Sequence, residues 1–119
     1  MRIRLTLLLL GLILMSCQKD HKEVLVQGQL IDQSTKKPIS DTPLVIENWA
    51  YGNSPDESYT IFQEYLTKTN SEGYFEQYLD VSSYVVLRIK SIKYRDTVHG
   101  FNVSNGKNTF NLKLEPLRD

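Results

Sequence analysis

Hydrophobic and polar residues alternate along most of the chain after residue 23, with the period of two that is typical of β-strands. The clearest alternation lies within 84–92, where Val85, Leu87 and Ile89 fall on one face. Polar turns rich in Gly, Asn, Ser and Pro separate the alternating segments, and Asn105-Gly106 is typical of a β-hairpin. Seven segments fit a strand: 24–32, 44–47, 59–69, 74–81, 84–92, 95–103 and 109–114. The pattern predicts an all-β fold, a seven-stranded antiparallel β-sandwich.

One segment fits a second interpretation. The apolar residues of 60–68 also have the spacing of one helix face, so this segment is either a strand or a helix. Elsewhere helical signals are scarce, because Ala50 is the only alanine and the plentiful Val, Ile, Thr, Tyr and Phe favour strands. Since no helices are expected between the strands, a doubly wound α/β fold is disfavoured.

The first 16 residues differ from the rest of the chain. Arg2 and Arg4 precede an apolar run at residues 5–15, and this arrangement is typical of a secretory signal peptide. As a helix the run would rise about 16 Å, roughly half of the hydrocarbon core of a bilayer. A transmembrane helix is therefore the weaker interpretation.

The apolar run ends in Leu14-Met15-Ser16-Cys17, which resembles the lipobox of bacterial lipoproteins. The resemblance implies cleavage of a signal peptide, residues 1–16, and acylation of Cys17. The alternative is an ordinary signal peptide followed by a chance cysteine. Cys17 is the only cysteine, which excludes a disulfide scaffold. More than one acyl chain anchors a protein stably, so the membrane is the first expected partner.

Residues 17–23 form a charged tether between the predicted anchor and the predicted β-sandwich domain, residues 24–119. Gln18, Lys19 and Asp20 resemble the surface-export signal of Bacteroidota-type lipoproteins. That resemblance implies an outer-membrane lipoprotein exposed at the cell surface. The alternative is a flexible, solvated tether on a lipoprotein that faces the periplasm.

Charge excludes one further class of protein. The 119 residues include 14 Lys+Arg and 14 Asp+Glu. Residues 1–16 hold two of the basic residues and no acidic one, so the remainder has 12 basic and 14 acidic side chains and a net charge of −2. A nucleic-acid-binding protein needs a basic face, so nucleic acid is not an expected partner.

The predicted domain does not need disulfides to be stable. A body of ~100 residues can bury a sufficient hydrophobic core without them.

Two motifs, at residues 26–32 (VQGQLID) and 69–75 (TNSEGYF), carry a resemblance to a known family. With Pro38 between them, they resemble the carboxypeptidase regulatory-like domain. That domain is a transthyretin-like (prealbumin-like) β-sandwich related to Cna-B-type modules. Lys36 and Asp41 stand where the family often has glycine, which predicts altered turns.

The motif residues have structural roles. Glycine inside a strand marks a bulge or a close backbone approach, which we expect at Gly28. Asp32 can accept hydrogen bonds from the backbone of the next turn, and Pro38 fixes the entry to the next strand. We expect Gly73 to have a positive φ and Phe75 to pack inward. The family resemblance implies a folding, adhesion or docking module without conserved chemistry.

Residues that could carry catalysis do not form a recognisable motif. His21 and His99 are the only histidines, and they do not cluster with other metal ligands in the sequence. A triad of Ser82, His99 and Asp80 lacks the glycines of a nucleophile elbow. The transthyretin-like hydrolases of 5-hydroxyisourate end in Tyr-Arg-Gly-Ser, which this sequence lacks. We therefore expect no catalytic residue, no metal and no cofactor.

Residues 48–59 carry the strongest signal for a binding site. Trp49, the only tryptophan, lies with Tyr51 and Tyr59 among small polar residues. Long loops on a rigid sandwich commonly carry function, and aromatic faces can stack on sugars or anchor a protein partner. The alternative is that Trp49 extends the second strand and only covers the core.

These observations predict a non-enzymatic, lipid-anchored β-sandwich that serves as a binding or accessory module of a surface or envelope complex. Two alternatives stay open. One is a carbohydrate-binding surface lipoprotein that uses Trp49 and Tyr51, and the other is a periplasm-facing envelope scaffold.

Overall fold

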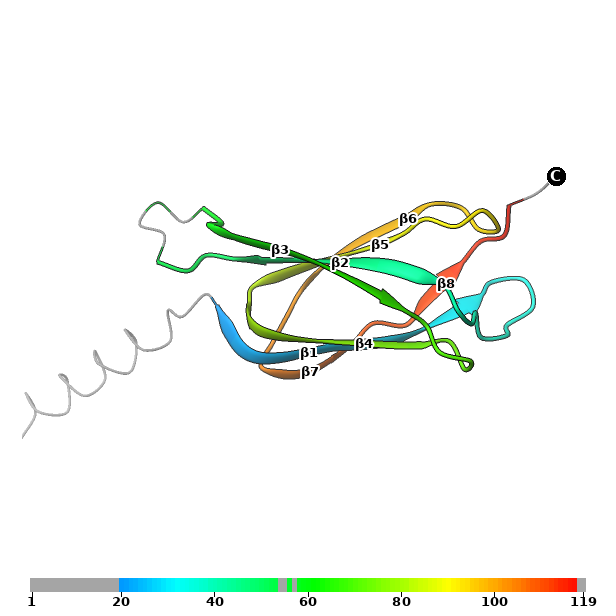
Figure 1. Ribbon diagram of the computed structural model, residues 1–119, viewed down its shortest axis with the longest axis horizontal. Coiled ribbons are helices and arrows are strands. Elements are labelled where there is room, and N and C mark those ends of the chain that lie inside the picture. The colour runs from blue at the N-terminus through cyan, green and yellow to red at the C-terminus, as the bar shows by residue number, and fades with distance from the viewer. Residues whose placement is uncertain (1–19, 54–55, 57, 118–119) are drawn as a thin grey trace, which may run out of the picture.

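The computed structural model describes residues 20–53, 56 and 58–117, and it confirms the predicted all-β sandwich (Figure 1). Residues 61–68 form a strand, so the alternative of a helix there is wrong. No helix among the described residues is long and apolar enough to cross a membrane. Cys17, Gln18, Lys19 and the predicted signal peptide lie outside the described residues. The strands are β1 (His21–Asp32), β2 (Pro43–Ala50), β3 (Ile61–Lys68), β4 (Tyr74–Ser82), β5 (Tyr84–Ile89), β6 (Thr97–Asn102), β7 (Gly106–Thr109) and β8 (Leu112–Leu114).

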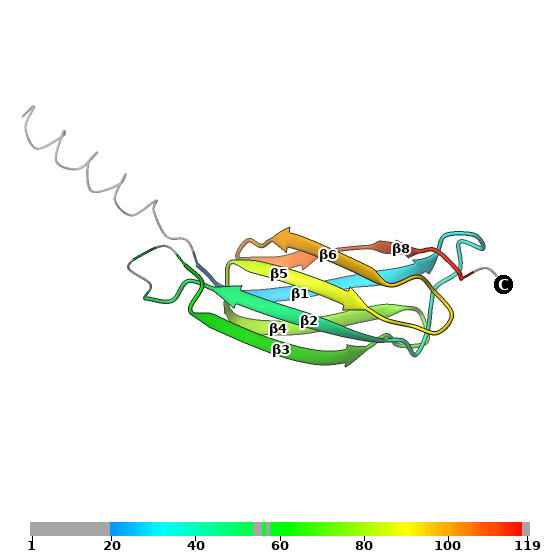
Figure 2. The ribbon, with the colours of Figure 1, turned by 90° about the horizontal axis from the view of Figure 1, so that it is seen from above.

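The strands form two sheets that pack face to face. The first sheet has the order β4-β1-β7, and β8 pairs with β1 beyond β7. β4 runs antiparallel to β1, whereas β7 and β8 run parallel to it, so the predicted antiparallel pairing is wrong for these two short strands. The second sheet has the order β3-β2-β5-β6 and is antiparallel throughout. Figure 2 shows the strands of both sheets following one common axis, which is the aligned packing of β-sandwiches.

The predicted hairpin at Asn105-Gly106 is wrong. β6 pairs with β5 in the second sheet, whereas β7 pairs with β1 in the first sheet. Residues 103–105 therefore cross from one sheet to the other. Gly106 has a φ of +82°, as a tight turn requires. A turn-forming dipeptide does not specify which sheet the following strand joins, and this is why the local signal misleads.

The last predicted strand, 109–114, is divided between β7 and β8, which makes eight strands where seven were expected. The backbone N–H of Phe110 donates to the carbonyl of Gln27 at 2.8 Å. The carbonyl oxygen of Phe110 lies where a Cβ on Gly28 would stand. The close backbone approach predicted at Gly28 is therefore present, and the chain at Phe110 can reach β1 only because residue 28 has no side chain.

The inner faces of the two sheets enclose one hydrophobic core. Alternate residues of the strands point into it, as the period of two requires. Phe75, which the sequence predicts to pack inward, is only 4% exposed. The buried apolar side chains of the core come from strands of both sheets and from the connections between them: Val24, Val26, Leu30, Ile39, Leu44, Ile46, Phe75, Leu79, Val85, Leu87, Ile89, Val103, Leu112 and Leu114.

The two ends of the sandwich differ in what they carry (Figures 1 and 2). β1, β3, β5 and β7 begin at the end where β2, β4 and β6 finish. We name this the tether end, because Asp20 leads into β1 there. The opposite end, which we name the far end, carries the turns at residues 33–42, 69–73 and 90–96.

Candidate functional site

The three aromatic residues predicted to form a contact site lie together at the tether end. The ring centroids of Tyr51 and Tyr59 are 4.6 Å apart in a stacked pair, and the ring of Trp49 is 5.9 Å from that of Tyr59. Phe62 of β3 adds a fourth ring, centred 4.3 Å from Trp49. We name Trp49, Tyr51, Tyr59 and Phe62 the aromatic cluster.

Strand register places the cluster on the outer face of the second sheet. Along β2, Asn48 and Ala50 are buried against the core, so Trp49 between them points outward. Trp49 pairs with Phe62 on β3 and with Tyr84 on β5, and directly opposed residues of neighbouring strands share a face. Trp49 therefore does extend the second strand, as the alternative interpretation held, but its ring does not cover the core.

The aromatic cluster is open to solvent. Tyr59 and Phe62 are 41% and 45% exposed, and Trp49 and Tyr51 are half-buried. Further along the same face, Leu66 of β3 is 77% exposed. Large apolar side chains that gather at one exposed place mark interaction surfaces more reliably than single exposed ones. The cluster is therefore a candidate contact site.

Asp20 fastens the cluster to the start of β1. Its Oδ1 accepts hydrogen bonds from the Tyr51 N–H at 2.9 Å and the Ser83 hydroxyl at 2.6 Å, and its Oδ2 accepts from the Gly52 N–H at 2.8 Å. Burial opposes the negative charge, but these three hydrogen bonds outweigh it and hold the pKa of Asp20 below its usual value. Asp20, predicted as part of an export signal, thus also makes contacts within the fold.

The two tyrosines of the cluster are joined through their side chains. The hydrogen bond with the Tyr51 side chain, together with burial and the nearby Asp20 charge, raises the pKa of Tyr59 to about 12. The Tyr59 hydroxyl therefore ionises only at higher pH than an ordinary tyrosine. The Thr60 hydroxyl donates to the Tyr51 carbonyl at 2.6 Å, which ties the start of the loop to its end.

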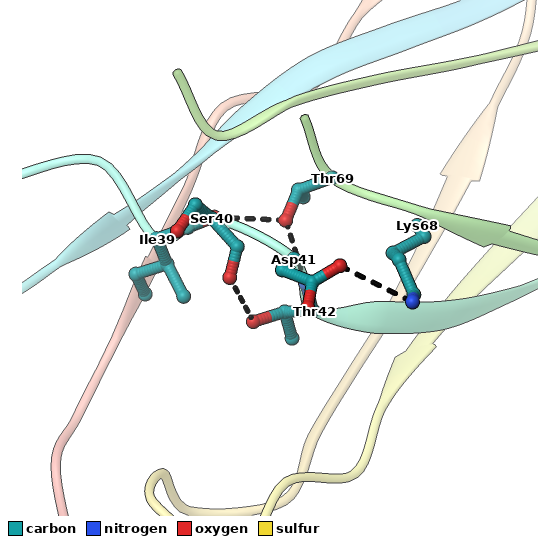
Figure 3. Close-up of polar contacts among 6 residues, drawn as sticks. All are labelled: Ile39, Ser40, Asp41, Thr42, Lys68 and Thr69. Carbon is teal, nitrogen blue, oxygen red and sulfur yellow. Dashed lines mark hydrogen bonds and ion pairs between the residues drawn. The ribbon is translucent and has the colours of Figure 1, made fainter. Parts of the chain in front are cut away.

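The far end is held by a compact set of polar contacts (Figure 3). Thr69 is 3% exposed, and its hydroxyl donates to the Ile39 carbonyl at 2.8 Å while accepting from the Thr42 N–H at 2.9 Å. Lys68 Nζ lies 3.1 Å from Asp41 Oδ1 in an exposed ion pair. These contacts fix the turn that leads into β2 against the end of β3.

Left-handed backbone recurs in the turns of the far end. Lys36 has a φ of +64° and Asp41 a φ of +53°, so both positions keep the conformation that glycine favours. Gly73 has a φ of +79°, as its turn predicts, and Pro38 forms an isolated bridge with β1.

Asp32 closes the turn after β1, as its position predicts. Its Oδ1 accepts from the N–H groups of Ser34 at 2.8 Å and Thr35 at 3.0 Å. Its Oδ2 accepts from the Tyr94 hydroxyl at 2.8 Å. The hydrogen bonds from Thr35 and Tyr94 hold the pKa of Asp32 below its usual value.

The residues weighed for catalysis are distributed over both sheets. Asp80 and Ser82 lie on β4 of the first sheet, and His99 lies on β6 of the second, beside Phe101. Ser82 is fully buried, and its Oγ is one of two buried side-chain atoms without a hydrogen-bond partner among the described residues. The described part of the chain contains no group of three or more His, Cys, Asp or Glu residues placed to hold a metal ion.

Comparisons with known proteins find similar folds and no relatives by sequence. No protein-family model and no curated protein matches the chain. Catechol 1,2-dioxygenase from Acinetobacter sp. ADP1 is 10% identical, with a TM-score of 0.60 over 82% of this chain and 54% of that one. The corresponding enzyme from Pseudomonas arvilla C-1 is 12% identical, with a TM-score of 0.60 over 83% and 54%. The C-terminal domain of the shaft pilin SpaA from Lactobacillus rhamnosus GG is 12% identical, with a TM-score of 0.51 over 84% and 100%.

These similarities show the fold. The chain spans about half the length of the dioxygenases and matches the full length of the pilin domain. Together they place the chain among β-sandwiches of the Cna-B and prealbumin-like kind, which is the coarse fold that the sequence predicts. At 10% and 12% identity they carry no statement about activity or partners.

Proposed function

We propose that the protein is an outer-membrane lipoprotein, anchored through acylated Cys17, whose β-sandwich is a non-enzymatic binding or accessory module of a surface or envelope complex. The observation that carries the proposal is that the folded sandwich begins only a few residues after the lipobox-like motif. Asp20 follows Cys17 by three residues and is already hydrogen-bonded to the sandwich. A domain that begins so soon after an acylated cysteine would be held at the membrane surface, with its polypeptide outside the bilayer.

The contacts of the titratable groups support a module without chemistry of its own. Strongly perturbed pKa values often mark catalytic groups, but they also arise in structural hydrogen bonds. Asp20 and Asp32 each hold a turn. Burial, together with the hydrogen bond that Tyr94 donates to Asp32, raises the pKa of Tyr94. The raised pKa of Tyr59 belongs to its hydrogen bond with Tyr51. Each perturbed group therefore has a role in holding the fold.

We further infer that the domain is a carboxypeptidase regulatory-like module. The motif at residues 26–32 forms the second half of β1, and the motif at 69–75 forms the turn into β4. The left-handed conformations of Lys36 and Asp41 support the inference, because these are the positions where the family often has glycine. The family resemblance implies adhesion or docking as the role of the module.

Metabolic labelling with a fatty-acid analogue tests the anchor. The wild-type protein should incorporate the label and sediment with the membrane fraction. Cys17→Ala should incorporate none and should leave the membrane fraction, because the thiol that accepts the lipid is gone. Label on the Cys17→Ala variant, or none on the wild type, would contradict the proposal.

Protease shaving of intact cells distinguishes a surface protein from a periplasm-facing scaffold. The wild type should be digested on intact cells if it is displayed. Because Asp20 also holds the Tyr51 turn, Gln18→Ala combined with Lys19→Ala is the cleaner test of the export signal. Protection of the wild type until the envelope is permeabilised would favour the periplasm-facing alternative.

A carbohydrate-binding function is the second candidate, because the exposed rings of Tyr59 and Phe62 flank Trp49. Glycan-array binding that Trp49→Ala abolishes would support it. A folded wild-type protein that binds no glycan on the array would exclude the glycans displayed there.

A further inference from the structure

The aromatic cluster lies at the end of the molecule that the predicted anchor enters. An extended chain spans at most about 3.6 Å per residue, so the Cα atoms of Cys17 and Asp20 are at most ~11 Å apart. Asp20 in turn holds the backbone N–H groups of Tyr51 and Gly52 at 2.9 and 2.8 Å. The cluster is therefore close to whatever surface holds the acyl chains of Cys17.

We propose that the aromatic cluster rests in the interface of the lipid leaflet that holds Cys17, so that lipid headgroups and upper acyl chains cover its exposed rings. The inference rests on the acylation proposed above. Trp and Tyr favour this position in proteins because one part of each ring is apolar and the other is polar. Phe62 and Trp49 supply the apolar surface, and the Tyr51 and Tyr59 hydroxyls supply polar groups for the headgroup level.

The electrostatics of the tether end are compatible with this position. The carboxylate of Asp20 is engaged by three hydrogen-bond donors within the fold and is not a free charge directed at the membrane. The Tyr59 hydroxyl is neutral at physiological pH, as an ordinary tyrosine is. The one negative charge of Asp20 is thus directed into the fold, and Tyr59 adds none.

The same geometry disfavours a folded protein domain or a sugar as the group that covers the aromatic cluster. The ~11 Å limit between Cys17 and Asp20 leaves too little depth for a folded protein domain, which is tens of ångströms across, between the tether end and the membrane. A sugar stacks flat on a ring face, and the stacked pair of Tyr51 and Tyr59 covers one face of each of these two rings. A lipid surface needs no open ring face.

Contact at the cluster would orient the whole sandwich. Acyl chains alone attach one point of the protein, whereas the rings on the outer face of β2 and β3 add a second contact to one side of the tether end. The far end, with the turns at residues 33–42, 69–73 and 90–96, would then project away from the membrane. Partners of an oriented module would meet those turns first.

Trp49 is the only tryptophan of the chain, so its fluorescence reports on the cluster alone. The acylated protein, purified from membranes in detergent, is reconstituted into vesicles of phosphatidylethanolamine and phosphatidylcholine. In vesicles whose phosphatidylcholine carries brominated acyl chains, the emission of Trp49 should be roughly halved, because bromine quenches only at short range and the ring lies in the interface. Acrylamide, which stays in water, should quench it less than in the unanchored Cys17→Ala protein.

A relocated probe gives the matched control. Trp49→Phe combined with Leu66→Trp moves the tryptophan to the same outer face of the second sheet. Position 66 lies four residues beyond Phe62 on β3, about 13 Å further from the tether end. Its emission should not respond to brominated lipid. Phe62→Ser should weaken the quenching of Trp49, whereas Leu66→Ser, at an equally apolar and more exposed position, should leave it unchanged.

Each remaining outcome decides against the inference. If the acylated protein floats with the vesicles while Trp49 is quenched only by acrylamide, the cluster stands clear of the lipid and the inference is overturned. A shift of Trp49 emission on adding a glycan, or a cross-link from the cluster to another protein in cells, overturns it in favour of that partner. Failure of the anchor itself is recognised separately, because the mass of the purified protein then shows no acyl group.

Discussion

One aspartate lies at each end of β1, and the two make different kinds of contact at the two ends of the molecule. Asp20 directly precedes the strand and Asp32 is its last residue, and each carboxylate accepts hydrogen bonds from two backbone N–H groups and one hydroxyl. The two amides held by Asp32 lie two and three residues away, whereas those held by Asp20 lie 31 and 32 residues away. The same chemistry closes a local turn at one end and ties down a distant loop at the other.

The two ends of the sandwich are therefore held in place in different ways. At the far end, the turn after Asp32 forms within its own stretch of chain, and the buried Thr69 hydroxyl fastens the next turn. At the tether end, the loop that begins at Tyr51 is fixed only when the start of β1 is in place. The far end is therefore stabilised by buried contacts, and the tether end couples the chain beside Cys17 to exposed rings.

The largest effect is expected from breaking the far end. Thr69→Val removes the hydroxyl that the buried Thr42 N–H and the Ile39 carbonyl share, and should lower the free energy of unfolding by about 2–3 kcal/mol. Denaturant unfolding measures the loss. Thr67→Val, at a half-buried site near the end of β3, should change stability by less than about 0.5 kcal/mol. Equal losses in the two variants would refute the role given to Thr69.

The two aspartates can be compared directly. Asp20→Asn replaces one acceptor oxygen by an amide and should lower the free energy of unfolding at pH 7 by about 1 kcal/mol, after allowance for solvent screening. Asp20→Asn should also shift the emission of Trp49, because the cluster loses its tie to β1, whereas Asp32→Asn should leave that emission unchanged. A Trp49 spectrum that responds equally to both variants would contradict the comparison.

The pH dependence of the two aspartates has the same sign. Both pKa values are lowered by folding, so both carboxylates contribute stability above the ordinary pKa of about 3.9. That stability is lost as the pH falls from this value through the lower folded pKa. Each Asp→Asn variant should therefore lose less stability than the wild type on acidification below pH ~4.

A smaller effect, of opposite sign, is expected where non-glycine residues have a left-handed backbone. Lys36→Gly at the far end should raise the free energy of unfolding by about 0.5–1 kcal/mol, because glycine avoids the steric cost of φ +64°. Glu23→Gly, at φ +53° near the tether end, should act in the same direction. Lys37→Gly is the control and should destabilise slightly, since only the entropy of the unfolded chain changes there. Stabilisation by Lys37→Gly would show that backbone strain at Lys36 is not the cause.

A separate effect on the fold is expected in alkali, outside the pH range in which the other variants are compared. Tyr59 ionises at about 12 in the folded protein and near 10 in the unfolded chain, so its contribution to stability is complete below pH 10 and lost between pH 10 and 12. The ultraviolet difference spectrum between the wild type and Tyr59→Phe follows this single group. Tyr51→Phe should lower the pKa of Tyr59 towards 10, and an unchanged value would argue against the hydrogen bond between them.

Much of the fold could be predicted from the sequence, because the patterns that specify strands and turns lie within short segments. The period of two predicts the strands and the inward face of Phe75, and the turn residues predict the positive φ of Gly73. The hairpin at Asn105-Gly106 and the undivided strand at 109–114 were wrong for one reason. The sheet that a strand joins depends on partners far away in the sequence, here β1 and the gap left by Gly28.

The candidate site divides in the same way. Trp49, Tyr51 and Tyr59 stand out in the sequence because aromatic residues are unusual in a polar segment. Phe62 joins them only through the register of β2 and β3. That register follows from burying one face of each strand, which a single segment does not reveal.

The sequence by itself determined the class of fold and the turn that Asp32 closes, and it also predicts an anchor at Cys17. Each depends on residues within a few positions of one another, where chain geometry alone decides which groups meet. The tertiary structure decided that Asp20, three residues from Cys17, holds Tyr51 and Gly52, and that the aromatic cluster therefore lies beside the tether. Hydrogen bonds across 31 and 32 residues form only once the packing of both sheets has brought the ends of β1 and β2 together.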